Sequence, residues 1–138
     1  MHIRAFEEKD GEAVIALWQS CSLVAPQNDP QRDIQRKLLA GRELFLVGEE
    51  AEVVIASAMG GYDGHRGWLN YLAVCPTKRG SGLGRQMMET LEQLLLAMGC
   101  PKLNLQVRDS NSDAIAFYRA LGYQVDPVTS LGKRLISD

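Results

Sequence analysis

Apolar and polar residues alternate along this chain with two different periods, which mark out its secondary structure. Alternation at every second residue predicts strands, and apolar residues three and four apart predict helices. The predicted strands cover residues 3–6, 44–47, 53–59, 68–74, 103–107, 123–125 and 128–136. The predicted helices begin at Asp10, Asp29, Gly82 and Asn111.

Capping residues support these helix boundaries. Asp10 and Asn111 carry side chains that accept hydrogen bonds from the first free amides of a helix. Asp29 is followed by Pro30, which suits the first helical position. Glycines that predict the helix ends stand at positions 41, 99 and 122.

The order of the predicted elements indicates the fold class. It runs strand, two helices, three strands, helix, strand, helix and two strands, without a linker or an internal repeat. Such an order predicts one α/β (α+β) domain over residues 1–138, with a mixed, mostly antiparallel sheet and helices on both faces. The two strands of the unit at 68–107 are expected to pair in parallel through a right-handed crossover.

Composition and charge exclude several classes of protein and of binding partner. Hydrophobic residues make up 46% of the chain and charged residues 23%, as in ordinary globular proteins. With 15 basic and 17 acidic residues, the net charge of -2 argues against nucleic acid as the main partner. The three cysteines lack C-x-x-C spacing, so we expect buried thiols and neither disulfides nor a metal site. No apolar run approaches a membrane span or a signal-peptide core, and we expect a cytoplasmic protein without membrane contact.

A glycine-rich segment between a predicted strand and a predicted helix carries the clearest chemical signal. Residues 79–85 read Arg-Gly-Ser-Gly-Leu-Gly-Arg. Glycines leave the backbone N–H groups of a turn accessible, and the first amides of a helix have no internal acceptor. Together with the helix dipole, these groups form an anion site that suits phosphate. Lys78, Arg79 and Arg85 add three cations.

Two familiar nucleotide motifs do not fit this segment. A Walker loop requires G-x-x-x-x-G-K-[S/T], which is absent, and the spacing G-x-G-x-G differs from the Rossmann fingerprint G-x-G-x-x-G. The acid expected about 20 residues further on is missing near Asn104. A turn that only connects a strand to a helix is the alternative to a ligand site.

At this point the chain resembles the GNAT N-acetyltransferases. Residues 79–84 fit the family signature [R/Q]-x-x-G-x-[G/A] between a strand and a helix. Residues 111–123, Asn-Ser-Asp-Ala-Ile-Ala-Phe-Tyr-Arg-Ala-Leu-Gly-Tyr, are similar to the family's N-x-x-A-x-x-F-Y-x-x-L-G-[F/Y] helix. The element order matches over nearly the whole chain, and residues 59–67 and 130–136 resemble the bacterial YpeA-type subgroup.

The resemblance implies acetyl-CoA as acyl donor, without a metal, and an amine as acceptor. It implies a central pair of parallel strands, 68–74 and 102–107, that splay apart around the acetyl group. Backbone N–H groups near Leu72 or Ala73 would polarise the thioester oxygen. The implied coenzyme-binding residues are Leu72, Ala73, Val74, Arg79, Gly80, Ser81, Gly82, Leu83, Gly84, Arg85, Asn111 and Tyr118.

Tyr118 is the residue to which the resemblance gives a catalytic role, as the acid that protonates the leaving thiolate. A packing role on an apolar helix face, beside Phe117 and Leu121, is the alternative. Asn111 is expected first to cap the helix, and the resemblance implies that its side chain also reaches the coenzyme. No base is identified, because Gln106 stands where ribosomal-protein N-acetyltransferases of the family carry a glutamate.

Further polar residues are weaker candidates. Asp63 and His65 lie in a predicted loop, where solvated side chains are the usual finding. Charged residues from Asp29 to Arg36, Asp33 among them, fall in the region where GNAT proteins shape the acceptor pocket, although charge runs of helical spacing usually face solvent.

Three functions therefore remain open at this stage. The first is an acetyl-CoA-dependent N-acetyltransferase acting on a small-molecule or peptide amine, as a monomer or a homodimer. The second is a non-catalytic acyl-CoA-binding or sensing module with the same fold. The third is an unrelated nucleotide-binding protein that uses the loop at Gly80–Gly84.

Overall fold

The computed structural model describes residues 1–137 and divides the chain into two compact units, Met1–Leu105 and the residues from Gln106 onward. The first unit contains a five-stranded sheet in the order β1-β2-β3-β4-β5. Its strands are β1 (His2–Ala5), β2 (Phe45–Glu50), β3 (Val53–Tyr62), β4 (Gly67–Val74) and β5 (Leu103–Leu105). The first four strands pair antiparallel, and β5 pairs parallel to β4. The predicted mixed, mostly antiparallel sheet is confirmed.

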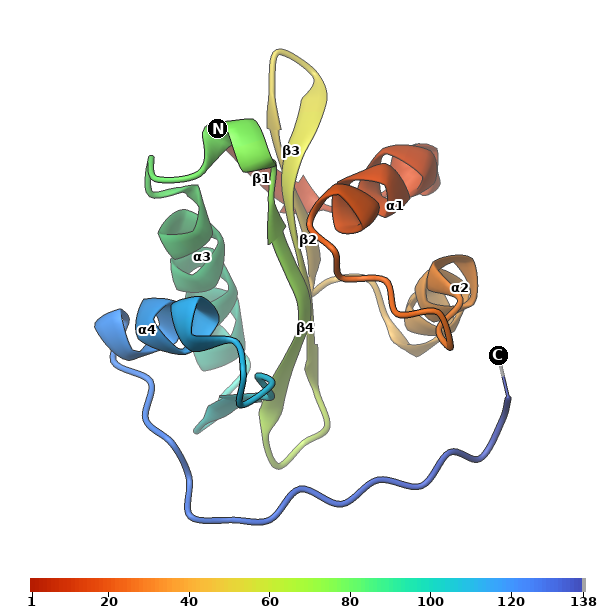
Figure 1. Cartoon of the computed structure of the whole chain (residues 1–138). Helices are drawn as coiled ribbons and strands as arrows, with labels where there is room; N and C mark the ends of the chain where they lie inside the picture. The colour runs from red at the N-terminus through yellow and green to blue at the C-terminus, as the bar shows by residue number, and fades with distance from the viewer. Residues whose placement is uncertain (138) are drawn as a thin grey trace. The chain divides into compact units, whose positions relative to one another are not determined.

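Helices cover both faces of this sheet, as predicted. α1 (Gly11–Ser20) and α2 (Pro30–Ala40) lie on one face, and α3 (Leu83–Ala97) lies on the other (Figure 1). Two 3-10 turns, η1 (Glu8–Asp10) and η2 (Pro76–Lys78), precede α1 and α3. None of the helices in residues 1–137 is long and apolar enough to cross a membrane.

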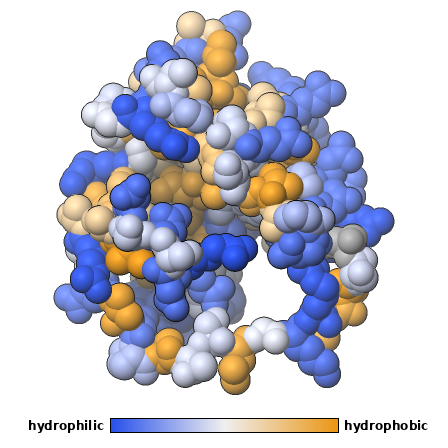
Figure 2. Space-filling model, viewed as in Figure 1, coloured by the Kyte–Doolittle hydropathy of each residue, from blue (hydrophilic) through white to orange (hydrophobic). Residues whose placement is uncertain are grey.

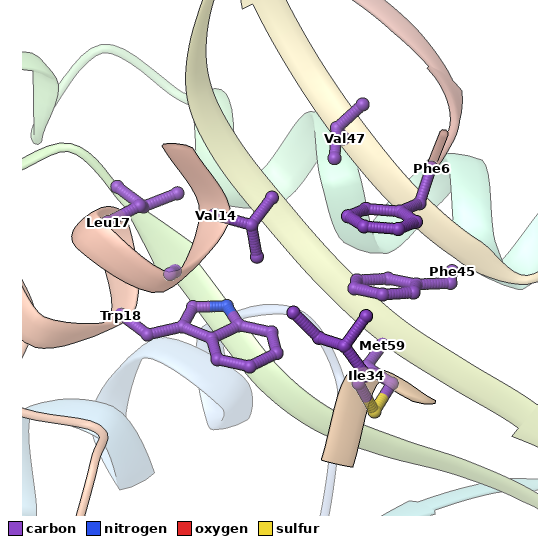
Figure 3. Packing of buried hydrophobic residues seen from close by; sticks show 9 residues of the cluster. Phe6, Val14, Leu17, Trp18, Ile34, Phe45, Val47 and Met59 are labelled. Carbon is purple, nitrogen blue, oxygen red and sulfur yellow. The ribbon is translucent and has the colours of Figure 1, made fainter. Parts of the chain in front are cut away.

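The core beneath α1 and α2 is built on aromatic rings. Phe6 stacks on Phe45 with ring centroids 4.4 Å apart, and the Trp18 ring lies 6.3 Å from Phe45 (Figure 3). Ser57 is the buried polar residue of this region, and its Oγ accepts a 2.9 Å hydrogen bond from Trp18 Nε1. The bond gives both polar groups a partner, and this compensates the cost of removing them from water.

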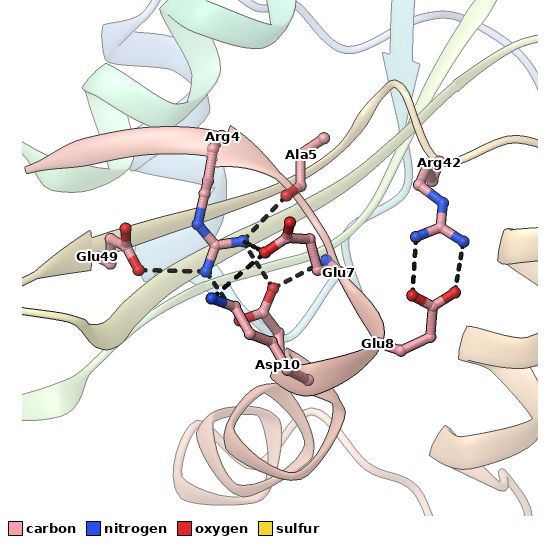
Figure 4. A network of polar contacts seen from close by, with 8 residues as sticks. Arg4, Ala5, Glu7, Glu8, Asp10, Arg42 and Glu49 are labelled. Atoms are coloured by element: carbon pink, nitrogen blue, oxygen red, sulfur yellow. Dashed lines mark hydrogen bonds and ion pairs between the residues drawn. The ribbon is translucent and has the colours of Figure 1, made fainter.

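The predicted cap Asp10 makes a different set of contacts. Its carboxylate accepts two hydrogen bonds from Arg4, at 2.8 and 2.9 Å, and one from the Glu7 amide at 2.9 Å (Figure 4). Arg4 also donates to Glu49 at 3.2 Å. Asp10 precedes α1 without a side-chain hydrogen bond to that helix. Asp10 therefore links the start of α1 to Arg4 of β1, and Arg4 in turn links β1 to β2, while Asp10 does not cap the helix.

The other predicted caps are confirmed. Asp29 Oδ1 accepts hydrogen bonds from the amides of Gln31 and Arg32, at 3.0 and 3.2 Å, at the start of α2. Asn111 Oδ1 accepts from the Ala114 amide at 3.1 Å at the start of α4 (Ser112–Ala120). Both bonds satisfy amides that the helix itself leaves free.

The second unit contains one helix, α4 (Ser112–Ala120). Alternation predicts two closing strands at 123–125 and 128–136, but residues 121–137 form neither helix nor strand. The parallel pair β4–β5 consequently stands at the end of the strand order. Apolar side chains along this segment are exposed, among them Val128, Leu131 and Leu135. Figure 2 shows apolar residues interspersed with polar ones on the surface.

Candidate active site

The parallel pair of strands separates part-way along β4. Gly67, Trp68 and Leu69 are paired with Leu103, Asn104 and Leu105, where β5 ends. β4 continues to Val74 and remains paired with β3 on its other side. Five residues of β4 therefore follow the last β5 pair, and their polar groups on that side have no β5 partner. A segment of extended backbone with one open side is a template for a further strand or for an extended ligand.

A β-bulge lies within this segment. The register runs from Asn70 opposite Met59 to Ala73 opposite Ser57, so Tyr71 and Leu72 together face Ala58 of β3. Tyr71 has a φ of 55°, in the left-handed region that a bulky aromatic residue rarely adopts. Bulges of this kind re-aim backbone groups and are often found beside active sites.

The predicted contact residues at the end of β4 follow the bulge directly. Ala73 is buried, whereas Leu72 and Val74 are half-buried. The strand ends on the β3 side with a 2.7 Å hydrogen bond from the Cys75 amide to Ile55 O. These residues therefore lie on the part of β4 that β5 does not pair, where the family resemblance predicts the thioester.

The predicted phosphate loop links β4 to α3. Gly80 and Gly82 have φ values of 84° and 83°, and a Cβ built on either would meet no atom within 4 Å. α3 begins without a side-chain cap, and the Gln86 amide donates to Gly82 O at 3.1 Å. The preceding amides at 83–85 therefore have no acceptor within the helix. Arg79, Gly80, Ser81 and Gly82 are exposed, while Leu83 is buried and anchors the helix.

Three cations lie on or beside this loop. Lys78 pairs with Glu50 at 3.4 Å, and Arg85 pairs with Glu89 at 3.7 Å, both at exposed positions. Arg79 Nε donates to Val74 O at 3.4 Å. Exposed ion pairs of this length are weak, so these cations are available to an anion. The open loop, the free amides and the cations together fit a pyrophosphate.

Tyr118 and Asn111 belong to the second unit and lie on α4 and at its N-cap. The Tyr118 ring packs edge-on against Phe117 and Tyr123, with centroids 5.0 and 5.7 Å away. Burial raises the pKa of Tyr118 to about 12, so the hydroxyl is protonated at neutral pH. The hydroxyl is therefore in the form that a proton donor requires. Gln106 Nε2 donates to Ser130 Oγ in the same unit.

Asp63 and His65 lie in the hairpin loop between β3 and β4. Asp63 Oδ1 accepts from the amides of Arg66 and His65, at 2.7 and 2.8 Å, and these bonds lower the pKa of Asp63. Both residues are exposed at the end of β4 opposite to the glycine loop. They belong to an exposed turn, in agreement with the solvated loop that is the usual finding for such residues. In residues 1–137, no group of three or more His, Cys, Asp and Glu side chains is arranged to hold a metal ion.

The sequence gives no indication of several residues that surround the bulge. Tyr71 stacks on Trp18 and donates a hydrogen bond to Asp33, and the buried Ser57 lies beside it. A lone serine in the apolar run at 53–59 is the one local signal of this cluster. Cys75, read from the sequence as a buried thiol, is half-buried, and its hydrogen bond with Thr77 lowers its pKa.

Comparisons with known proteins agree with this geometry. The sequence model of the Acetyltransferase (GNAT) family matches residues 11–123. The chain belongs to the GNAT acetyltransferase family. It is an N-acetyltransferase, and it is 49% identical over 138 residues to an acetyltransferase of Yersinia enterocolitica, covering all of this chain and 98% of the relative.

Solved GNAT structures share the fold. The chain aligns with Ard1 from Thermoplasma volcanium at a TM-score of 0.79 and 27% identity, over 91% of this chain and 83% of that one. Its alignment with the aminoglycoside acetyltransferase AAC(6')-Iy, in complex with the bisubstrate analogue CoA-S-monomethyl-acetylneamine, has a TM-score of 0.78 at 19% identity. That alignment covers 96% of this chain and 97% of the other.

Proposed function

We propose that this GNAT acetyltransferase transfers the acetyl group of acetyl-CoA to a primary amine of a small molecule or a peptide, by direct attack in a ternary complex. The observation that carries the proposal is the end of β5 at Leu105, which leaves β4 open from the bulge to Val74 directly before the glycine loop. An open strand followed by an anion site matches the two chemical halves of coenzyme A, an extended amide-containing arm and a pyrophosphate. A cytoplasmic location goes with this donor.

The residues of the first unit bind and polarise the donor in this proposal. Backbone amides from Arg79 to Arg85 hold the pyrophosphate, and the backbone of Leu72 to Val74 pairs with the pantetheine arm as an added strand would. The N–H of Leu72 or Ala73 donates a hydrogen bond to the thioester oxygen, on which negative charge develops during attack. Preorganised backbone donors of this kind lower the barrier because they need no reorientation.

The proton transfers complete the reaction. The neutral amine attacks the thioester carbon, a C–N bond forms, and the C–S bond breaks. Tyr118 gives its hydroxyl proton to the departing thiolate. Gln106 does not take up a proton at neutral pH, so the attacking nitrogen loses its extra proton to water.

A second candidate is the acyl-CoA-binding module without turnover, and Gln106 is the observation that favours it. The glutamine stands where ribosomal-protein enzymes of the family carry a glutamate that acts as a base, and its amide donates a hydrogen bond to Ser130. The two candidates differ in whether acetyl transfer follows the binding of acetyl-CoA.

The first experiment is a set of thermal unfolding curves of the purified chain with acetyl-CoA, CoA, ATP and NAD. At about 100 times its dissociation constant, a ligand adds about 2.7 kcal/mol to the free energy of unfolding, which raises the melting temperature by several degrees. We expect this shift with acetyl-CoA and CoA alone. A shift with ATP or NAD instead, or none with either coenzyme, overturns the proposal. Binding without acetyl transfer to a panel of amines supports the module.

A further inference from the structure

The bulge residue Tyr71 has an unusual backbone that its neighbours must maintain. Its φ of 55° is unfavourable for a residue with a large side chain, and such a conformation persists only where surrounding contacts over-determine it. Tyr71 and Leu72 oppose the single residue Ala58, so the regular ladder to β3 is interrupted at this point. Side-chain contacts of Tyr71 add to what the ladder supplies at this point.

Three side chains from distant parts of the first unit hold Tyr71. Its ring stacks on Trp18 of α1, with centroids 3.9 Å apart and planes within 9°. Its hydroxyl donates to Asp33 Oδ2 of α2 at 2.5 Å, a short bond to a carboxylate. The buried Ser57 of β3, which accepts from Trp18, places its Oγ 3.5 Å from Tyr71 O. The ring, the hydroxyl and the carbonyl of Tyr71 are thus each in contact with a different element.

The position of the Tyr71 carbonyl sets the direction of the next amide. In a planar trans peptide the C=O and the N–H point in opposite directions. The Tyr71 carbonyl accepts from the Ser57 hydroxyl, which also bonds Trp18 of α1, so the Leu72 N–H is directed away from that hydroxyl. Leu72 also lies beyond the last β5 pair, Leu69–Leu105. The contacts of Tyr71 therefore set the direction of the Leu72 N–H at a point of β4 that β5 does not pair.

We propose that Asp33, Tyr71 and Trp18 form a positioning cluster that fixes the Leu72 N–H as the hydrogen-bond donor to the thioester oxygen of acetyl-CoA. The inference rests on the proposed function and names the side chains on which its backbone donor depends. Asp33 anchors the hydroxyl, Trp18 anchors the ring, and the bulge between them keeps the amide out of the ladder. These residues act through Leu72 and make no contact with the reacting atoms in this proposal.

If the cluster acts in this way, altering it weakens the binding of acetyl-CoA more than the binding of CoA, because only acetyl-CoA has the oxygen to which the Leu72 N–H donates. Tyr71→Phe keeps the ring on Trp18 and removes the bond to Asp33. We expect this variant to raise the Kd of acetyl-CoA at least 5-fold and to leave the Kd of CoA within 2-fold. We expect kcat to fall about 10-fold, which is less than the fall caused by complete removal of an oxyanion donor. Isothermal titration and steady-state kinetics measure these values.

The infrared spectrum of bound acetyl-CoA gives a readout that does not depend on turnover. A hydrogen bond lowers the stretching frequency of the thioester carbonyl, so carbon-13-labelled acetyl-CoA bound to the wild type shows a lower frequency than in water. Tyr71→Phe shifts this band back toward the value in water. A change of packing alone does not move it.

Asp33 supplies a loss-and-rescue pair, and Tyr62 supplies a matched control. Asp33→Leu removes the acceptor of the Tyr71 hydroxyl and reproduces the effects of Tyr71→Phe, whereas Asp33→Asn keeps an acceptor oxygen and restores most of the wild-type values. Tyr62→Phe removes a hydroxyl whose bond to Gly64 O, at 3.3 Å, lies in the distant hairpin, and it changes neither readout.

The outcomes separate the cluster from the proposed function. Suppose that Tyr71→Phe and Asp33→Leu fold and keep the wild-type acetyl-CoA affinity, kcat and carbonyl band. That result overturns the positioning cluster and leaves the proposed function intact. If Tyr71→Phe does not fold, the comparison of Asp33→Leu with Asp33→Asn decides. A wild type that binds neither acetyl-CoA nor CoA overturns both.

Discussion

Tyr118 packs against two aromatic rings, and the burial that results also sets the acidity of its hydroxyl. Its pKa of about 12 keeps the proton in place throughout the range in which the protein is studied. A protonated hydroxyl is what the proposed acid role requires. The packing role and the proposed chemical role are therefore compatible.

Replacing Tyr118 with Phe tests the chemical role. The ring and its edge-on packing remain, and the proton is lost, so we expect kcat to fall about 10²- to 10⁴-fold while the Kd of CoA stays within a few-fold. Steady-state kinetics and isothermal titration measure the two effects.

The control for this variant is Tyr123→Phe, which removes a hydroxyl from the ring beside Tyr118 and leaves kcat within a few-fold of the wild type. In the wild type, the pKa of about 12 also predicts that kcat does not decline up to pH 10. An unchanged kcat in Tyr118→Phe assigns the residue to packing alone.

Among the elements, α3 is the one whose start forms the proposed pyrophosphate site. Gly82 precedes the helix in a left-handed conformation, with open space where a Cβ would lie. A side chain there is strained by about 1–2 kcal/mol, and it also projects into the space that the pyrophosphate needs. The two effects are separable by experiment.

We expect Gly82→Val to weaken CoA binding at least 10-fold, as measured by isothermal titration. The matched control is Gly64→Val, since Gly64 also has a positive φ, 90°, and open space, but lies in the β3–β4 hairpin. Both variants lose similar free energy of unfolding from backbone strain, and only Gly82→Val loses affinity. Equal CoA affinity in the two variants contradicts the loop as the pyrophosphate site.

Comparison of predicted and observed elements shows which features local sequence determines. Capping by Asp29 and Asn111 depends on near neighbours, and these predictions are confirmed. The bulge at Tyr71 depends on Trp18 and Asp33, which lie 53 and 38 residues away in sequence and leave no local trace. Strand formation at 128–136 likewise needs a partner edge, which an alternating pattern does not supply.

At the scale of the whole chain, the ion pair between Arg4 and Asp10 links segments that the sequence alone does not connect. Asp10 is 4% exposed, and Arg4 is the main reason that its pKa is lowered, with burial acting in the opposite direction. An aspartate whose pKa is lower in the folded state adds stability that is fully present above the unfolded value of about 3.9 and is lost as the pH falls through the folded value.

We therefore expect Asp10→Asn to lower the free energy of unfolding by about 2–4 kcal/mol at pH 7, because it leaves Arg4 without its main partner while Glu49 remains. The difference from the wild type shrinks as the pH is lowered below 4. Urea unfolding at pH 7 and pH 3 measures both values.

Glu8→Gln is the comparison for this variant. Glu8 pairs with Arg42 on the surface, at 2.6 and 3.2 Å, and this pair holds the pKa of Glu8 at about 2. Solvent screens exposed pairs, so this variant loses far less stability than Asp10→Asn. A loss that is equal in the two variants, or that is independent of pH, contradicts the role of the Arg4 network.

The stacking of Trp18 on Tyr71 also gives the molecule an optical property. The chain has two tryptophans, and they differ in environment: Trp18 is fully buried against the bulge, whereas Trp68 is 39% exposed on β4. Buried indoles fluoresce at shorter wavelength than solvent-exposed indoles, so the emission of Trp18 is separable from that of Trp68. Trp18 thereby acts as an intrinsic fluorophore whose colour and lifetime report the geometry of the bulge in every sample, without a label.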